Sequence, residues 1–100
     1  MDSLEALRSR LAPLFPGLMG VQLVEVTPER VRATLLVRPD LCTTGDSMHG
    51  GAFMAFADTL GGVATFVNLP PNTRTTTIES STKFLRGAPV GSTVQAECTA

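Results

Sequence analysis

The sequence places one carboxylate inside an almost wholly apolar stretch. Asp58 stands within residues 52–60, which read Ala-Phe-Met-Ala-Phe-Ala-Asp-Thr-Leu. Asp is a poor residue for a helix interior, and burying a carboxylate without a partner costs free energy. A carboxylate held in an apolar pocket is a usual arrangement for a nucleophile or a general base. The alternative is a structural Asp bonded to an Arg or to a neighbouring chain, although no basic residue lies nearby in the sequence.

A second candidate group precedes this stretch, at His49-Gly50-Gly51. Glycines at the start of a helix leave the first-turn N–H groups open, and the helix dipole favours negative charge there. An oxyanion that develops on a carbonyl would be stabilised in that position. The alternative interpretation is that the two glycines only form a turn.

The spacing of these two groups has a geometric consequence. Gly50 and Asp58 are eight residues apart, which corresponds to about 12 Å along a helix axis. A carboxylate and an oxyanion donor that act on one carbonyl must both lie within a few ångströms of it. If both are catalytic, Asp58 must meet Gly50 of a second copy, with the two helices antiparallel across a two-fold axis.

The element that must carry both groups is predicted to be a helix from His49 to Val67. Its apolar side chains are distributed all round a helical wheel, which indicates a helix enclosed by the rest of the fold. It is shorter than the ~20 residues that span a bilayer, so we expect protein rather than membrane to enclose it. Gly61 and Gly62 each disfavour a helix by about 1 kcal/mol relative to Ala, which indicates close packing there.

Shorter elements flank this helix. An amphipathic helix opens the chain, because Leu4, Leu7 and Leu11 share one face, and Pro13 and Pro16 end it. The sequence predicts four strands. These are few for enclosing a helix of this length, so we expect the chain to be a truncated form of a longer domain. Alternating side chains predict two of these strands, at 31–37 and 94–100, and an abundance of β-branched residues predicts a third at 75–86. A weaker strand is predicted at 22–26, a turn at 27–30 and a loop at 39–47.

The composition restricts the class of protein. A net charge of −1 and the absence of Trp and Tyr argue against nucleic acid as a partner. The acidic N-terminal residues lack the basic-then-apolar plan of a secretion signal. Cys42 and Cys98 show neither metal-type spacing nor a disulfide framework, so we expect a cytoplasmic protein without a metal site.

The segment from Met48 to Gly62 (Met-His-Gly-Gly-Ala-Phe-Met-Ala-Phe-Ala-Asp-Thr-Leu-Gly-Gly) resembles the signature of the hotdog-fold thioesterases. Within the 4-hydroxybenzoyl-CoA thioesterase superfamily it is similar to the clade that contains the phenylacetate-pathway acyl-CoA thioesterases. The resemblance implies an α+β hotdog fold, in which a curved antiparallel sheet wraps a long central helix and a short N-terminal helix precedes it. It also implies a single domain over residues 1–100 that lacks its C-terminal strands, and subunits that form homodimers or homotetramers.

The resemblance further implies roles for the residues around the central helix. The Gly50 amide would polarise the thioester carbonyl, with Gly51 beside it. The Asp58 carboxylate of the partner subunit would activate water or attack the carbonyl itself. His49 would hold the loop or bind near the thioester rather than act as the base. Thr43 stands where many relatives carry Asn, and this departure puts the orientation of the water or of Asp58 in doubt.

Four further residues are assigned by the same resemblance. Thr77 aligns with the strand position on which relatives place a Ser or Thr that positions water, and Thr76 is one residue away. Lys83 and Arg86 lie near the positions that contact the CoA phosphates in relatives. The plain alternatives are that the threonines are strand formers and that the two cations are solvated surface charges.

The expected activity is hydrolysis of an acyl-CoA to the free acid and CoA, without a metal or redox cofactor. Two other classes compete with it. A non-catalytic acyl-CoA-binding module on the same fold would need no carboxylate such as Asp58 in its pocket. A hotdog dehydratase would rely on a His with a different neighbourhood from that of His49.

Overall fold

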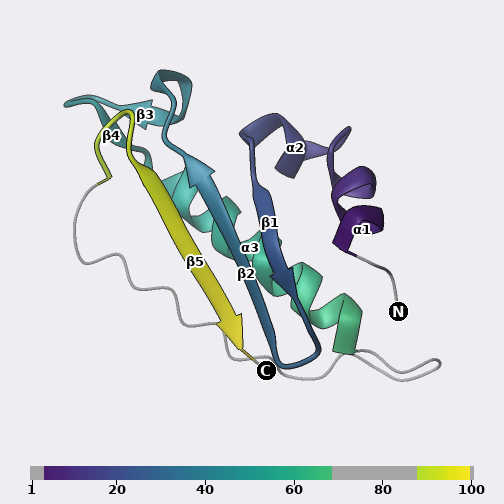
Figure 1. The fold of residues 1–100 in the computed structure, drawn as a ribbon. Coiled ribbons are helices and arrows are strands. Elements are labelled where there is room, and N and C mark those ends of the chain that lie inside the picture. Colours follow the sequence, from purple (N-terminus) through teal and green to yellow (C-terminus); the bar gives the residue numbers. More distant parts are fainter. Residues whose placement is uncertain (1–3, 69–87, 100) are drawn as a thin grey trace.

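The computed structural model describes residues 4–68 and 88–99, which form a three-stranded antiparallel sheet and a long helix laid along one of its faces (Figure 1). The sheet order is β1-β2-β5, and a two-stranded hairpin of β3 and β4 leads into the long helix α3. Two short helices lie beside α3 (Figure 1). The bounds are α1 Leu4–Leu11, α2 Phe15–Met19, β1 Gln22–Val26, β2 Arg30–Leu36, a 3-10 turn Pro39–Leu41, β3 Cys42–Thr43, β4 Ser47–Met48, α3 Gly50–Asn68 and β5 Thr93–Thr99.

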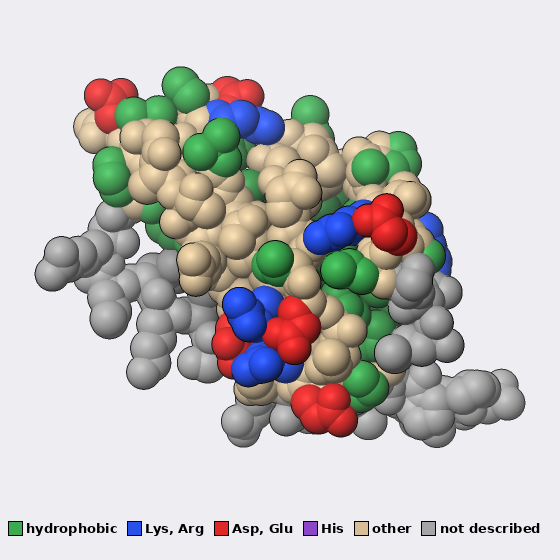
Figure 2. Space-filling model, in the orientation of Figure 1, with side chains coloured by type: hydrophobic (Ala, Val, Ile, Leu, Met, Phe, Trp, Pro, Cys, Tyr) green, Lys and Arg blue, Asp and Glu red, His purple; other side chains and the backbone are tan. Residues whose placement is uncertain are grey.

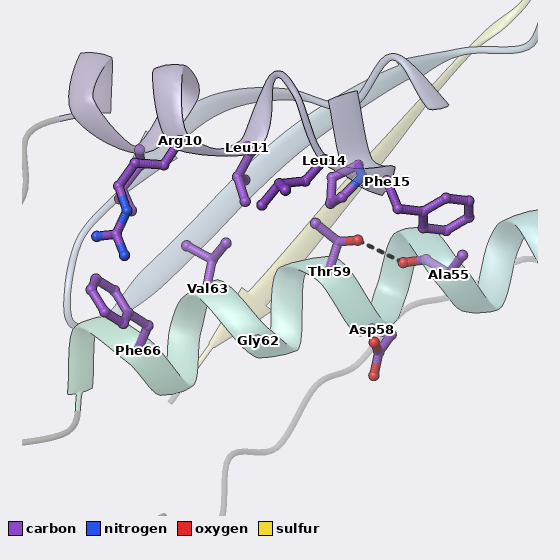
Figure 3. Close-up of a pocket in the computed structure, with 12 residues that line it drawn as sticks. Arg10, Leu11, Leu14, Phe15, Ala55, Asp58, Thr59, Gly62, Val63 and Phe66 are labelled. Atoms are coloured by element: carbon purple, nitrogen blue, oxygen red, sulfur yellow. Dashed lines mark hydrogen bonds between the residues drawn. The ribbon is translucent and has the colours of Figure 1, made fainter. Parts of the chain in front are cut away.

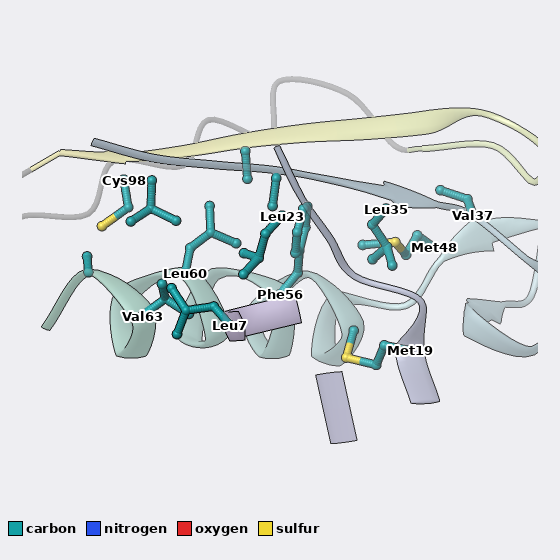
Figure 4. Packing of buried hydrophobic residues seen from close by; sticks show 14 of the residues in the cluster. Leu7, Met19, Leu23, Leu35, Val37, Met48, Phe56, Leu60, Val63 and Cys98 are labelled. Carbon is teal, nitrogen blue, oxygen red and sulfur yellow. The ribbon is translucent and has the colours of Figure 1, made fainter. Parts of the chain in front are cut away.

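The inner face of the sheet forms the core with one face of α3 (Figure 4). Side chains alternate across a strand, so every second residue of β2 points to the helix. Val31 lies opposite Cys98 and Ala33 opposite Ala96 in the pairing of β2 with β5. Phe56 of α3 packs among them and is completely buried. The predicted α+β hotdog arrangement of antiparallel sheet and central helix is therefore confirmed.

The outer face of the sheet is polar. Glu25 Oε1 forms ion pairs with Arg30 Nε at 3.2 Å and with Arg32 Nη1 at 3.3 Å. Acidic and basic side chains gather on this face (Figure 2). Exposed pairs of this kind contribute little to stability. They do mark the face that needs no protein cover, so the helices pack on the other one.

Most of the predicted local structure is confirmed within one or two residues: the first helix, the strands at 22–26, 31–37 and 94–100, and the turn at 27–30. The loop predicted at 39–47 is more ordered, because it contains the 3-10 turn and most of the β3–β4 hairpin. The strand predicted at 75–86 lies outside the described residues.

Helix α2 is not predicted from the sequence, in which Pro13 and Pro16 indicate only the end of the first helix. Pro16 stands in the first turn of α2, where a missing N–H costs nothing because that group has no partner within the helix. Gly20, in the left-handed conformation at φ 91°, ends it. A side chain at Gly17 would collide with the backbone of Ala12, so this glycine allows α2 to fold back on the end of α1.

The prediction that α3 is enclosed on all sides is wrong for the described part of the chain. Phe56 and Leu60 are buried, yet Met54 is 74% and Phe66 47% exposed on the other face. The expectation that this helix is too short to cross a membrane is also wrong, because Gly50–Val67 is long and apolar enough to do so by length and composition. The core helix of a globular fold satisfies the same criterion, and the packing of its buried face on the sheet gives α3 that role.

His49 determines how α3 begins. Its backbone N–H donates to the Leu41 carbonyl at 2.8 Å, and its carbonyl accepts the N–H groups of Ala52 and Phe53. Its Nδ1 atom accepts the Gly51 N–H at 2.7 Å. A Cβ atom at Gly51 would lie 2.9 Å from that nitrogen, so glycine there lets the ring approach. His49 is therefore the N-cap of the helix, with Nδ1 as acceptor and the ring proton on Nε2.

We expect His49→Ala to lower the free energy of unfolding by about 0.5–2 kcal/mol, the usual effect of losing a cap. His49→Asn should retain most of that stability, because the Asn side-chain oxygen is a preferred N-cap acceptor. Urea unfolding at one fixed protein concentration measures both values. Equal destabilisation by Ala and Asn would show that capping is not what His49 contributes.

Candidate functional site

Asp58 lies on the open face of α3 and is exposed rather than buried as predicted. The reason is its position two residues after Phe56, which turns it to the opposite side of the helix. Figure 3 shows its carboxylate directed away from α1 and α2. Within residues 4–68 and 88–99, no side chain or backbone group forms an ion pair or hydrogen bond with this carboxylate. The structural alternative of an Asp held by an Arg finds no support in this part of the chain.

Gly50 is the first residue of α3, and it is exposed. The next three amides of the helix are occupied: that of Gly51 by the His49 ring, and those of Ala52 and Phe53 by the His49 carbonyl. Among the described residues, no hydrogen bond is formed by the Gly50 N–H. A Cβ atom at Gly50 would meet nothing within 4 Å, so the approach to this amide is open. An anion or polarised carbonyl oxygen can therefore bind at Gly50.

One continuous helix joins these two groups. Gly50 and Asp58 both belong to α3, so they remain about 12 Å apart along its axis. A single chain therefore does not bring them to one carbonyl. Met54 lies midway between them and is the most exposed large apolar side chain of the helix.

Of the other predicted site residues, the structure describes two and leaves four outside the described ranges. Thr43 is exposed in β3, where it pairs with Ser47 in the hairpin that precedes α3. The Gly51 amide is used by the helix cap. Thr76, Thr77, Lys83 and Arg86 lie outside the described residues.

Neither Cys42 nor Cys98 is as good a candidate nucleophile as Asp58. Cys98 is 1% exposed in the core, and this burial raises the pKa of its thiol above the ordinary value. A thiol that resists ionisation is a poor nucleophile. The Cys42 thiol donates to the Arg38 carbonyl at 3.4 Å. The described ranges also contain no group of three or more His, Cys, Asp or Glu side chains suited to holding a metal.

Two hollows flank α3 on the side of α1 and α2. One, of about 440 Å³, includes Asp58 on its edge (Figure 3). The other, of about 520 Å³, includes His49 and Gly51 at the helix start. Helix α2 contributes Phe15 to both hollows, a contribution not predicted from the sequence. The sequence signal that could have indicated this contribution is the apolar pair Leu14-Phe15 between Pro13 and Pro16.

A family model described as Thioesterase superfamily matches residues 45–100, which include His49, Gly50 and Asp58. No curated protein matches the chain significantly in sequence. Solved structures do match in fold, and three of them illustrate the range.

A thioesterase from Haemophilus influenzae is 22% identical, with a TM-score of 0.79 over 99% of this chain and 68% of that chain. Thioesterase superfamily member 2 from Mus musculus is 20% identical, with a TM-score of 0.73 over 97% and 73% of the two chains. The PaaI protein of the phenylacetic acid degradation operon from E. coli is 19% identical, with a TM-score of 0.67 over 84% and 59%. At these identities the structures show the shared fold, and the family model shows the family. The chain belongs to the thioesterase superfamily and has the hotdog fold, as the segment from Met48 to Gly62 predicted.

Proposed function

We propose that this protein hydrolyses acyl-CoA thioesters to the free acid and CoA, at a site that two subunits share. The observation that carries the proposal is the pairing of an open helix-start amide, Gly50, with an exposed carboxylate, Asp58, on one helix of a thioesterase-superfamily chain. The carboxylate is what distinguishes this site from that of a non-catalytic acyl-CoA-binding module.

The chemistry assigned to Gly50 is stabilisation of negative charge. When a nucleophile adds to the thioester carbonyl, the carbonyl oxygen becomes an oxyanion. The Gly50 N–H at the positive end of α3 would donate a hydrogen bond to it. Because His49 already occupies the Gly51 amide, Gly50 is the better candidate of the two glycines.

The chemistry assigned to Asp58 has two forms. As a general base it takes a proton from water, whose oxygen adds to the carbonyl carbon. As a nucleophile it adds to that carbon itself, and water then hydrolyses the resulting anhydride. In both forms the C–S bond breaks and the CoA thiolate leaves and is protonated. Water is the co-reactant in both, and the scheme requires no metal or redox cofactor.

The geometry of α3 supports the proposal that two subunits share the site. Met54 is four residues from Gly50 and four from Asp58, and it is 74% exposed. If two α3 helices pack antiparallel with their two-fold axis near Met54, Gly50 of each copy lies opposite Asp58 of the other. This arrangement would also cover the apolar face that one chain leaves open.

Residues outside the described ranges complete the proposed site. Thr77, or its neighbour Thr76, would orient the attacking water. Lys83 and Arg86 would bind the CoA phosphates as cations. We include Thr43 as a residue that borders the helix start through the β3–β4 hairpin.

We expect Asp58→Asn to lower kcat/KM by at least about 10²-fold, a typical contribution of a general base. Asn has nearly the same shape, so the fold should be retained. Thiol release from acyl-CoA, followed with a thiol reagent, measures the rate. Asp46→Asn is the matched control, because Asp46 is an exposed carboxylate in the β3–β4 turn. Near-full activity of Asp58→Asn would contradict the mechanism, and binding without thiol release by the wild type would indicate a binding module.

Mixing two inactive variants tests whether the site is shared. Gly50→Val should block the oxyanion amide and lower turnover by about 10²–10³-fold, while the open space at this position lets the chain fold. After Asp58→Asn and Gly50→Val are refolded together, each mixed dimer has one site with both lesions and one with neither. Random pairing should therefore return about a quarter of wild-type activity.

Two results would contradict the shared site. If both residues served one site within a single chain, mixing would restore nothing. A monomer in light scattering, at the concentration at which the wild type is active, would contradict it independently.

A further inference from the structure

The two hollows beside α3 adjoin one another, because Phe15 and Ala55 line both, and we call the pair the trough. One end of the trough borders His49 and Gly51 at the start of α3. The other end lies between α1 and the last turns of α3, at Arg10 and Phe66 (Figure 3). From Gly51 to Gly62 the trough follows the helix for about 16 Å. Its two parts measure about 440 and 520 Å³, within the usual range for small-molecule sites.

The inner part of the trough is the hollow that includes Asp58 on its edge, and most of its lining is apolar. It is formed by leucines of α1, by Leu14 and Phe15 around the start of α2, and by Val63 and Phe66 of α3. Thr59 presents no free hydroxyl, because its Oγ1 donates to the Ala55 carbonyl at 2.8 Å (Figure 3). The Arg10 guanidinium lies 5.0 Å from the centre of the Phe66 ring and covers the far end.

The floor of the trough is Gly62, the position where a side chain would take up its space. A Cβ atom at Gly62 would meet nothing within 4 Å, so this glycine is not required by close packing in the described part of the chain. A glycine in mid-helix costs about 1 kcal/mol relative to Ala. An open trough is a physical reason for its presence.

We propose that this trough binds the acyl chain of the substrate and selects apolar chains of medium length over acetyl. This inference rests on the proposed function, because it places the thioester carbonyl at Gly50 and extends the acyl group past Phe15 toward Gly62. Phe15 is 60% exposed at the junction of the two hollows, where it borders the chain's path. Between Asp58 on its edge and Arg10 at its far end, the inner part of the trough is lined mainly by apolar side chains, which favours an apolar acyl group.

The magnitude of the selection follows from the burial of methylene groups. Each methylene that leaves water for the trough should raise kcat/KM by about fourfold, up to the length that fills it. The kcat/KM for decanoyl-CoA should therefore exceed that for acetyl-CoA by several orders of magnitude at most. The ratio should be smaller where water remains in the trough.

The test compares two neighbouring glycines. Gly62→Leu fills the floor of the trough, and the ratio of kcat/KM for decanoyl-CoA over acetyl-CoA should fall by at least about 10-fold. Gly61→Leu is the matched control, because a Cβ atom there also meets nothing within 4 Å but Gly61 does not line the trough. Its ratio should equal that of the wild type. Leu14→Glu, at a 55% exposed lining position, provides a second variant that should also lower the ratio if Gly62→Leu does not fold.

The outcomes separate the two proposals. If the wild type hydrolyses acyl-CoA and both variants keep its ratio, the trough is not the acyl site, although the hydrolase activity stands. Calorimetric binding of decanoyl-CoA to the Asp58→Asn protein, with and without Gly62→Leu, measures the same preference without turnover. Weaker binding in the double variant, together with no thiol release by the wild type, would support the trough and overturn the hydrolase. Equal binding would overturn the trough in either case.

Discussion

The packing of α3 against the sheet positions the candidate functional groups that this helix carries. Phe56 and Leu60 fix which side of the helix faces β2 and β5. Because successive residues turn by about 100°, residues two positions away from these anchors point in nearly the opposite direction. Met54, Asp58 and Gly62 stand at those positions. The burial of two apolar side chains therefore presents the carboxylate, the exposed methionine and the floor of the trough on the side away from the sheet.

At the start of α3, the hydrogen bonds accepted by His49 leave one amide for a ligand. An uncapped helix would offer several first-turn amides to an anion. Here the His49 ring takes the Gly51 amide and the His49 carbonyl takes the next two. The Gly50 amide is left for a ligand, in a position anchored through the bond from His49 to Leu41. A capping role for His49 thus has a consequence for chemistry without making the imidazole an acid or a base.

The two sides of α3 that do not contact the sheet have different neighbours. On one side α1 and α2 form the trough, which depends on Pro16 in the first turn of α2 and on Gly17 at its contact with Ala12. On the other side Met54 and Asp58 remain open in one chain. In our proposal the first side binds the acyl chain and the second meets the partner subunit. The same helix would then serve substrate selection and catalysis through different faces.

The sequence was enough to predict α1, α3, the strands β1, β2 and β5, and the distance that governs the site. Leu4, Leu7 and Leu11 have helical spacing, and the residues of β2 and β5 alternate, so local periodicity was enough to predict these elements. The separation of Gly50 and Asp58 follows from helix geometry alone. The Met48–Gly62 segment was also specific enough to indicate the family that the comparison confirms.

Only the tertiary structure decided which face of α3 is buried. Apolar residues are distributed evenly around this helix, so the sequence pattern does not indicate which face is buried. Contacts with distant strands bury Phe56 and Leu60 and leave Met54 and Phe66 exposed. The exposure of Asp58 follows from that choice, which is why the predicted burial was wrong. The pairing of β5 with β2, the formation of α2 and the trough between α2 and α3 likewise depend on contacts between residues far apart in the chain. Such contacts are set by the packing of whole elements, which no local window of sequence contains.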